Sequence, residues 1–390
     1  MRTMRKNVTA NLLFGFAIFL LLVVAVPLIL WLVQPKEKLD IFILDKTVPT
    51  KSRKEHSSFH WLLTYNKVSN SKGELYKITD YYGFFPESYS KSDFDFKSLS
   101  IADVNSISDS IDMAYYTDLY GVYYNNWYRK NSPQVSPKQK VYGGLNHNDY
   151  LLLKELKKKK KTIVTEFILL DKPTSDLVRK KTENLFDFYW EGWVGRCFSS
   201  LDTTENRDFP TWITQLYKQQ NKGEWPFTKA GIVLVHKFGK VVVLEESKHL
   251  NHPCLSIETN ETFQNKYKLP AKLNYCYWFD IVSTGETNTI AAKFNIDANS
   301  KGDSLLNRYS LKSSFPAVLA HEKEYRFYYF AGDFADNPVV KETAYFKGVE
   351  TIERLINSDR SCSRRNFFWE YYIPLMEGIM ENAKNQNPDN

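Results

Sequence analysis

The most apolar stretch of the chain lies near its N-terminus. Residues 12–33 form an uncharged run of 22 residues, LLFGFAIFLLLVVAVPLILWLV. A helix rises about 1.5 Å per residue, so this run would be roughly 33 Å long, against a hydrocarbon core of about 30 Å. The run is longer than the apolar part of a secretory signal and ends without a small-residue cleavage site. We therefore expect residues 1–34 to form a retained membrane anchor.

Basic residues are slightly more numerous before the apolar run than directly after it. Arg2, Arg5 and Lys6 precede it, and Lys36 and Lys38 follow it. Lysine and arginine near the ends of a span favour the cytoplasmic side. The sequence thus predicts a single-pass protein in the cell membrane, with a cytoplasmic N-terminus and an extracytoplasmic C-terminal domain.

After the anchor, the hydrophobic pattern alternates between strand and helix periods. The expected order is strand 38–48, helix 54–68, strand 108–123, helix 148–161, strand 161–170 and helix 173–187. Such alternation is typical of an α/β fold. We expect a mostly parallel, flavodoxin-like sheet with helices on both faces over residues 39–225. In open parallel sheets, sites lie beyond the carboxyl ends of the strands, which here means residues 45–46, 118–121, 143–144 and 166.

The second half of the chain has a different pattern. In residues 231–246, two apolar runs flank a polar centre at residues 236–240, which indicates a hairpin. Further strands are expected at 275–282, 289–296, 317–321 and 325–331, followed by an aromatic-rich helix over 364–383. We expect residues 226–390 to be a β-rich part with a C-terminal helix. Because no Gly/Ser linker separates the halves, one continuous domain is an equal alternative.

Composition excludes several classes of protein. Aromatic residues make up 15% of the chain, too many for a disordered tail. The net charge is +7, and the lysine run 157–161 supplies five of the positive charges. We interpret this run as a solvated helix end, because no nucleic-acid-binding motif accompanies it, and we expect no nucleic-acid partner. Phosphate-loop, dinucleotide and zinc-ligand motifs are absent from the sequence, so it predicts no metal and no cofactor.

The four cysteines are widely spaced and form no CxxC pair. One disulfide is expected if the domain lies outside the cytoplasm, with Cys254–Cys276 as a candidate pair. Free buried thiols are an equal alternative.

The turn Tyr142-Gly143-Gly144-Leu145, the helix after it, and the strand ending at Glu166 resemble the class I glutamine-amidotransferase fold. The whole chain is similar to membrane-anchored bacterial proteins. In the amidotransferase family, the Gly-Gly turn lies near the active site, and the later strand leads into a sharp elbow bearing a catalytic cysteine. Here the elbow position is occupied by Glu166-Phe167, with no cysteine nearby. The resemblance therefore implies the fold without glutaminase activity.

Residues 188–202, FYWEGWVGRCFSSLD, combine tryptophans, charges and glycines in one segment. Tryptophan faces stack on sugars, and a carboxylate and a guanidinium would bind polar groups. The alternative is a core-lining loop with buried tryptophans. The candidate ligand-binding residues are Tyr120, Gly143, Gly144, Trp190, Glu191, Trp193 and Arg196.

Three acidic residues are candidates for acid–base chemistry. Glu166 lies at the end of a predicted buried strand, where desolvation would raise its pKa. Asp333 and Asp336 follow the strand 325–331, and paired carboxylates at such a position are suited to glycoside hydrolysis. The alternatives are an ion pair for Glu166 and a polar turn for the two aspartates.

The function that these features favour is a membrane-tethered module that binds glycan or cell-envelope polymer. One alternative is a hydrolase of envelope polysaccharide that uses the paired carboxylates. Another is a structural subunit of an envelope complex. Whether the protein is an enzyme stays open at this point, and the sequence identifies no protein partner.

Overall fold

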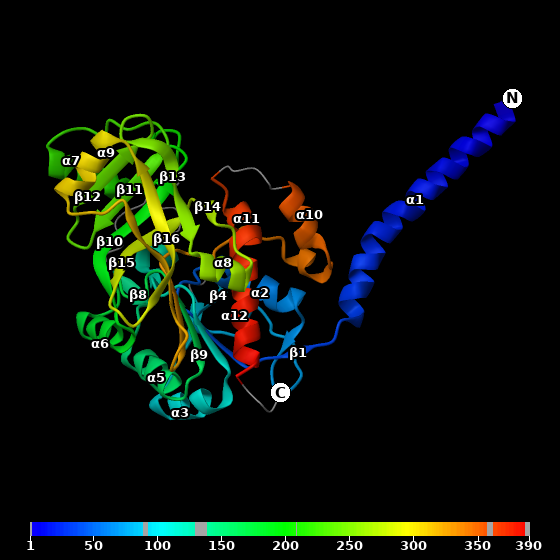
Figure 1. Ribbon diagram of the computed structural model, residues 1–390, viewed down its shortest axis with the longest axis horizontal. Helices are drawn as coiled ribbons and strands as arrows, with labels where there is room; N and C mark the ends of the chain where they lie inside the picture. The colour runs from blue at the N-terminus through cyan, green and yellow to red at the C-terminus, as the bar shows by residue number, and fades with distance from the viewer. Residues whose placement is uncertain (1, 89–92, 129–138, 208, 357–361, 387–390) are drawn as a thin grey trace.

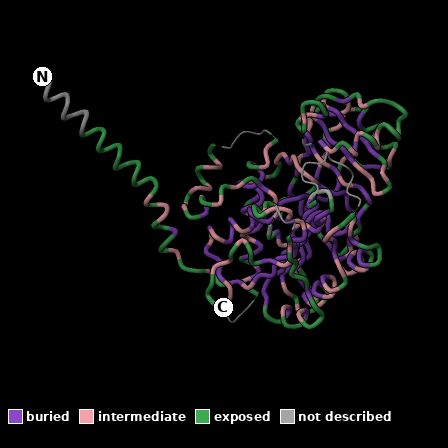
Figure 2. The backbone as a smooth tube through the Cα atoms, turned by 180° about the vertical axis from the view of Figure 1, so that it is seen from behind, coloured by how far each residue is buried: buried purple, intermediate pink, exposed green. Residues whose placement is uncertain are grey.

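The computed structural model describes residues 2–88, 93–128, 139–207, 209–356 and 362–386. Helix α1 (Arg2–Val33) projects from one side of the folded domain (Figure 1). Within the described residues it is the one helix long and apolar enough to cross a membrane, over Asn11–Val33. Figure 2 shows the contrast in burial: residues 11–33 of α1 are largely exposed, whereas buried segments fill the centre of the domain.

The domain is built around a large sheet of ten strands. In spatial order these are β14 (Lys272–Tyr275), β13 (Leu250–Thr259), β16 (Thr289–Ala298), β17 (Ser314–His321), β18 (Arg326–Phe330), β9 (Thr162–Glu166), β6 (Met113–Tyr116), β2 (Ile41–Asp45), β4 (Tyr82–Ser88) and β5 (Asp93–Lys97). The strands from β18 to β4 run parallel, and the others pair antiparallel. The predicted α/β class is therefore confirmed, whereas the predicted flavodoxin-like parallel sheet is not. Strands β2, β4, β6 and β9 of the first half pair in parallel, and β-strands of the second half extend them into a mixed sheet.

Helices cover both faces of this sheet. Successive side chains of a strand point to opposite faces. On β6, the Tyr116 hydroxyl donates to the carbonyl of Asp149 in α5 (His147–Lys158), at 3.0 Å, while the neighbouring Tyr115 hydroxyl lies 3.2 Å from the Tyr372 hydroxyl near the C-terminus. On the α5 side lie also α3 (Ile101–Ser110) and α6 (Asp176–Phe186). The opposite side holds α2 (Lys54–Tyr65) and the continuous C-terminal segment of α11 (Arg364–Phe367), η2 (Phe368–Tyr372) and α12 (Ile373–Lys384).

A smaller antiparallel sheet packs beside the large one. Its order is β12 (Val241–Glu245), β11 (Gly231–His236), β10 (Phe188–Phe198) and β15 (Trp278–Thr284), with α7 (Thr211–Asn221) packed against it. A separate apolar cluster that includes Phe198, Ile213 and Val233 joins α7 to this sheet. The segment 188–202, for which a core-lining loop was the alternative, thus begins with an 11-residue strand. Gly195 is needed in it for close packing, because a Cβ there would lie 2.2 Å from the ring of Phe279.

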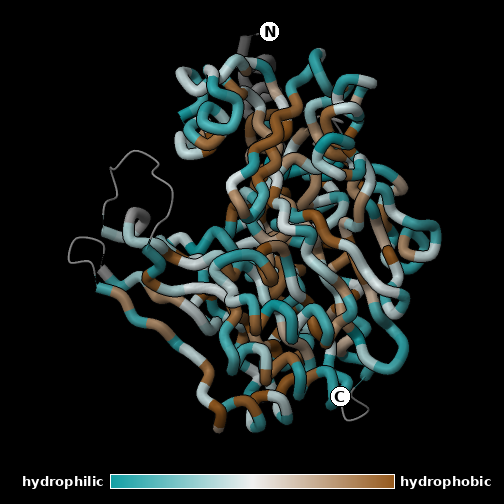
Figure 3. The backbone as a smooth tube through the Cα atoms, turned by 90° about the vertical axis from the view of Figure 1, so that its left-hand side faces the viewer, coloured by the Kyte–Doolittle hydropathy of each residue, from teal (hydrophilic) through white to brown (hydrophobic). Residues whose placement is uncertain are grey.

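Short elements complete the chain. They are β1 (Glu37–Lys38), β3 (Val68–Ser69), β7 (Val122–Tyr123), α4 (Tyr124–Trp127), β8 (Lys140–Tyr142), α8 (Glu261–Tyr267), α9 (Ser300–Arg308), η1 (Lys341–Tyr345) and α10 (Val349–Ile356). Figure 3 shows hydrophobic segments running through the interior of the domain and hydrophilic ones along its outer loops.

The disulfide joins Cys254 on β13 to Cys362 just before α11, with the Cα atoms 6.2 Å apart. Cys276 and Cys197 are free thiols. The candidate pair Cys254–Cys276 was therefore wrong. Spacing along the chain did not reveal the partner, because Cys362 reaches β13 only through the docking of the C-terminal helix, 108 residues later.

Candidate functional site

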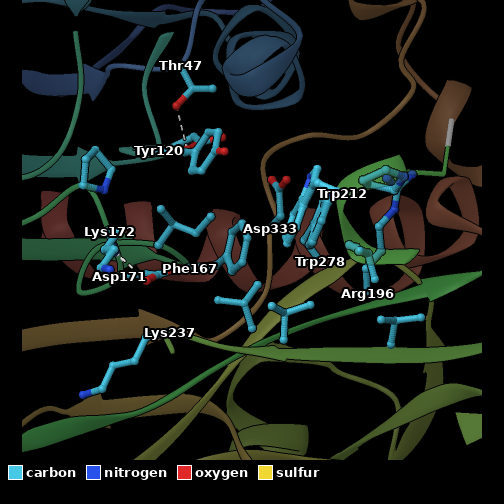
Figure 4. A pocket seen from close by; sticks show the side chains of 18 of the residues that line it. Thr47, Tyr120, Phe167, Asp171, Lys172, Arg196, Trp212, Lys237, Trp278 and Asp333 are labelled. Carbon is cyan, nitrogen blue, oxygen red and sulfur yellow. Dashed lines mark hydrogen bonds between the residues drawn. The ribbon is translucent and has the colours of Figure 1, made fainter. Parts of the chain in front are cut away.

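A cavity of about 830 Å³ lies at the carboxyl ends of β2, β6 and β9, where the large sheet meets the small one. Thr47 and Asp118 come from loops that follow parallel strands of the large sheet, while Arg196 and Trp278 come from β10 and β15 (Figure 4). This size lies within the usual range of small-molecule sites, about 300–1,000 Å³. The position is also where open parallel sheets place their ligands.

Aromatic rings form much of the cavity wall. They are Tyr120, Tyr123, Phe167, Trp190, Phe198, Trp212, Tyr277 and Trp278. On β10 the lining residues Val194, Arg196 and Phe198 alternate along the strand, so one face of β10 is turned toward the cavity. Rings of this kind present flat apolar faces together with polar hydroxyl and indole groups.

Two guanidinium groups are held against these rings. The Arg196 guanidinium lies 5.1 Å from the ring centre of Trp278 and 5.5 Å from that of Tyr277. Arg364 lies 3.6 Å from the Tyr277 ring and forms an ion pair with Asp336 at 2.7 Å. These cation–π contacts order Arg196 in the cavity wall, and Arg364 beside the lining residues Tyr277 and Asp336.

Five carboxylates also line the cavity: Glu55, Asp118, Asp171, Asp333 and Asp336. Asp118 Oδ1 accepts hydrogen bonds from the Thr47 hydroxyl at 2.7 Å and from the Tyr120 N–H at 2.8 Å. Burial raises the pKa of Asp118 to about 7, and the nearby Asp45 carboxylate adds to the effect. Burial also raises the pKa of Asp171 to about 6.

Two further acids of the cavity, Asp333 and Glu55, have pKa values perturbed in the same direction. Burial, followed by the charge of Asp336, raises the pKa of Asp333 well above its ordinary value; Figure 4 shows Asp333 next to Trp278. Burial and the Asp45 carboxylate likewise raise the pKa of Glu55, and Glu55 Oε2 is buried without a hydrogen-bond donor among the described residues. Clustered acids with raised pKa values are typical of sites that bind or transfer protons.

Paired charges lie directly behind these acids and hold the loop after β2. His56 Nδ1 lies 2.5 Å from Asp45 Oδ2. The buried Lys46 ammonium forms an ion pair with Asp149 and donates to the Gly144 carbonyl at 2.9 Å. Gly144 has φ +77°, and a Cβ there would lie 2.8 Å from the backbone of Pro173. The Gly-Gly turn is therefore a point of close backbone approach.

The structure brings together some of the candidate residues and separates others. Tyr120, Trp190, Arg196, Asp333 and Asp336 line the cavity. Gly143, Gly144, Glu166, Glu191 and Trp193 are not among its lining residues. Glu191 is exposed and accepts a hydrogen bond from Ser283, while Trp193 is buried with its ring centre 4.8 Å from that of His236.

Glu166 lies behind the wall of the cavity and is 2% exposed. It accepts hydrogen bonds from the Tyr115 hydroxyl and from the Ala335 N–H, the latter at 3.2 Å. Burial raises its pKa to about 8. Glu166 is therefore held by a hydroxyl and a backbone donor, and not by the ion pair that was the alternative.

The elbow after β9 retains an unusual backbone. Ile168 has φ +67° and its side chain lines the cavity. A β-branched residue at positive φ is rare and strained, and such strain persists where the surrounding structure imposes it. Here an aliphatic side chain that has no nucleophilic atom occupies the left-handed position.

Several lining residues carried little sequence signal. Residues 118–121 are an exception, because they lie in the carboxyl-terminal part of the predicted strand 108–123, and that position pointed to Asp118 and Tyr120. Trp212 on α7 and Trp278 on β15 resemble ordinary core aromatics in sequence, because their patterns are those of amphipathic elements. Glu55 lies in the first turn of α2, where an acidic residue is common for helix-dipole reasons alone.

Comparisons with known proteins add little to this description. No protein-family model matches the chain, and no curated protein is similar to it. A crystal structure described as a ThuA-like protein from Bacteroides uniformis ATCC 8492 aligns with 85% of this chain and 96% of its own, at 10% sequence identity and a TM-score of 0.35. A superposition this loose is a distant likeness and carries no argument about function.

Proposed function

We propose that α1 anchors the protein in a membrane, with the N-terminus in the cytoplasm, and that the extracytoplasmic domain binds glycan or cell-envelope polymer in the cavity. The observation that carries this proposal is the cavity wall itself, in which eight aromatic rings are combined with carboxylates and with the guanidinium group of Arg196. Sugar rings offer apolar faces for stacking and hydroxyls for charged partners.

The disulfide supports the extracytoplasmic side. Disulfides persist in oxidising compartments and are rare in the cytosol. Cys254–Cys362 ties β13 to the C-terminal helix and would be kept intact outside the cytoplasm. The excess of basic residues before the apolar run supports the same orientation.

Binding is tested with the full-length protein in lipid nanodiscs and a panel of envelope polysaccharide fragments. Trp212→Ala removes a cavity ring, and we expect it to weaken binding about tenfold, or about 1.4 kcal/mol. Tyr189→Ala is the matched control, because Tyr189 is an exposed aromatic on β10 that does not line the cavity. Equal loss in both variants, or no retention of any fragment, contradicts the proposal.

A second candidate function is hydrolysis of the bound polymer. The observation that favours it is the raised pKa of Asp118, about 7, in a cavity that also holds Asp336. A carboxyl that keeps its proton near neutral pH is suited to protonate a leaving group, while a second carboxylate acts as base or nucleophile. Glu166 lies behind the wall, so in this candidate Asp118 is the acid and Asp336, paired with Arg364, is the second carboxylate.

Hydrolysis is tested by mass spectrometry of the incubated fragments. We expect new products from the wild-type protein, and we expect Asp118→Asn to abolish them while fragments are still retained. Asp297→Asn, a substitution at β16 outside the cavity, is the control. Retention without products supports the binding module alone. Absence of both retention and products favours the structural-subunit alternative.

A further inference from the structure

The end of α1 is packed against the folded domain. The Trp31 indole N–H donates to the Thr64 carbonyl at 2.9 Å, and its ring lies 4.8 Å from that of Tyr345 in η1. The Lys347 N–H donates to the Pro27 carbonyl at 3.2 Å. Both Pro27 and Trp31 belong to the apolar run. The chain around Tyr345–Lys347 therefore reaches the level of the last two turns of the candidate membrane span.

Helix α10 follows this contact directly, and its apolar side faces outward. Ile352, Leu355 and Ile356 are 55%, 73% and 70% exposed, and α10 has no buried residue. Its polar side faces the domain, where Glu353 forms an ion pair with Arg365 at 2.6 Å. A surface helix of a soluble domain normally has the reverse orientation, with the apolar stripe on the core.

We propose that α10 lies in the interfacial layer of the membrane, with Ile352, Leu355 and Ile356 in contact with lipid acyl chains. This inference rests on the proposed membrane anchorage of α1. Pro27 lies six residues before Val33, which corresponds to a depth of about 9 Å along a helix. Interfacial helices bury their apolar faces by about 5–10 Å, so the contact at Pro27 puts α10 at the depth that such helices occupy.

Neighbouring side chains fit the same layer. Trp31 and Tyr345 form an aromatic pair, and such residues concentrate at membrane–water interfaces. The Lys67 ammonium lies 4.7 Å from the Trp31 ring centre, and the Lys347 ammonium lies 3.8 Å from that of Tyr65. Basic groups at this level are attracted to lipid phosphates. The membrane contact of α10 would add a second attachment point and restrict rotation of the domain about α1.

The test uses the full-length protein in phosphatidylcholine vesicles that carry a photoactivatable acyl chain, followed by peptide mapping of the lipid adducts. We expect adducts in α1 and in Val349–Ile356. Leu355→Glu should lower the α10 adducts about tenfold, the order expected when one leucine no longer enters an apolar layer, and should leave those of α1 unchanged. The control is Leu177→Glu on α6, where the exposed Leu177 should carry no adducts in the wild-type protein and where the substitution should alter neither α1 nor α10.

Each other outcome is decisive. Adducts in α1 without adducts in α10 overturn this inference and leave the anchor intact. Adducts in neither helix remove the membrane anchorage itself. Wild-type levels of α10 adducts in Leu355→Glu also overturn the inference about α10, because lipid contact would then not depend on its apolar face.

Discussion

Two sets of buried acidic residues lie within one region of the fold, behind and at the ends of the parallel strands, and they are held in different ways. In the first set, Asp45 contacts His56 and Asp149 forms an ion pair with Lys46. These acids are neutralised by basic side chains. They anchor the loop after β2 and the N-terminus of α5, so their role is structural.

In the second set, Asp118 and Glu166 are held by hydroxyl and backbone N–H donors, chiefly those of Thr47, Tyr115 and Ala335. Burial raises the pKa of Asp118 to about 7 and that of Glu166 to about 8. The hydroxyl and N–H donors of Asp118 and Glu166 carry no charge, so burial raises the pKa of both and favours the carboxyl that holds a proton near neutral pH. Asp118 faces the cavity and Glu166 does not, so only the former is placed to meet a ligand.

The largest expected effect comes from breaking a pair of the first set. Lys46→Met leaves Asp149 buried, at 1% exposure, without its cation. We expect the free energy of unfolding to fall by about 3–5 kcal/mol, measured by denaturant unfolding. The double variant Lys46→Met/Asp149→Asn should recover part of that loss. A loss below about 1 kcal/mol would show that the pair does not differ from a surface one.

The next effect concerns the pH dependence of stability in the second set. Because the pKa of Glu166 is raised to about 8 in the folded protein, the folded state keeps a proton that the unfolded chain releases above pH 4.5. Stability should therefore fall as the pH rises toward 8. Glu166→Gln should remove the part of this pH dependence that comes from one proton. Over pH 5 to 7.5 that part is a change in the free energy of unfolding on the order of 2–4 kcal/mol. Unfolding curves at several pH values measure the slope, and an unchanged slope contradicts the assignment.

A smaller effect is expected from the hydroxyl that holds Glu166. Tyr115→Phe removes a hydrogen-bond donor to a buried carboxyl and keeps the ring that packs on Phe59. The expected loss of stability is about 1–2 kcal/mol. Tyr116→Phe is the matched control on the opposite face of β6, where the hydroxyl donates to a backbone carbonyl. A larger loss from the control would place the stronger network on the α5 side.

The smallest effect is expected from an exposed pair. Lys272 and Glu258 are 2.9 Å apart across β14 and β13, with side chains 63% and 47% exposed. Lys272→Met should lower the free energy of unfolding by less than about 1 kcal/mol, and added salt should remove the difference. A loss comparable to that of Lys46→Met would show that burial is not what separates the two kinds of pair.

Local pattern predicted a good part of the elements. The strands at residues 41–45 and 162–166 and the helix at 54–65 lie within the predicted ranges, and the helix at 147–158 begins one residue before its predicted range. The hydrophobic periodicity of each of these elements depends only on residues close together in the chain, so it can be recognised in the sequence. The strand 188–198 was missed because its glycines resemble loop residues, and only the partner strands β11 and β15 show that they serve close packing.

The sequence by itself determined the apolar N-terminal helix, the alternation of strand and helix in the first half, and the strand end that carries Asp118 and Tyr120. These features depend on residues close together in the chain. Only the tertiary structure decided the mixed order of the large sheet and the Cys254–Cys362 bond. It also decided that β10, α7 and β15 form the second wall of the cavity. The physical reason is that strand pairing and burial depend on segments that are distant in sequence. Such distant segments also give Asp149 a lysine as its partner and Asp118 the Thr47 hydroxyl.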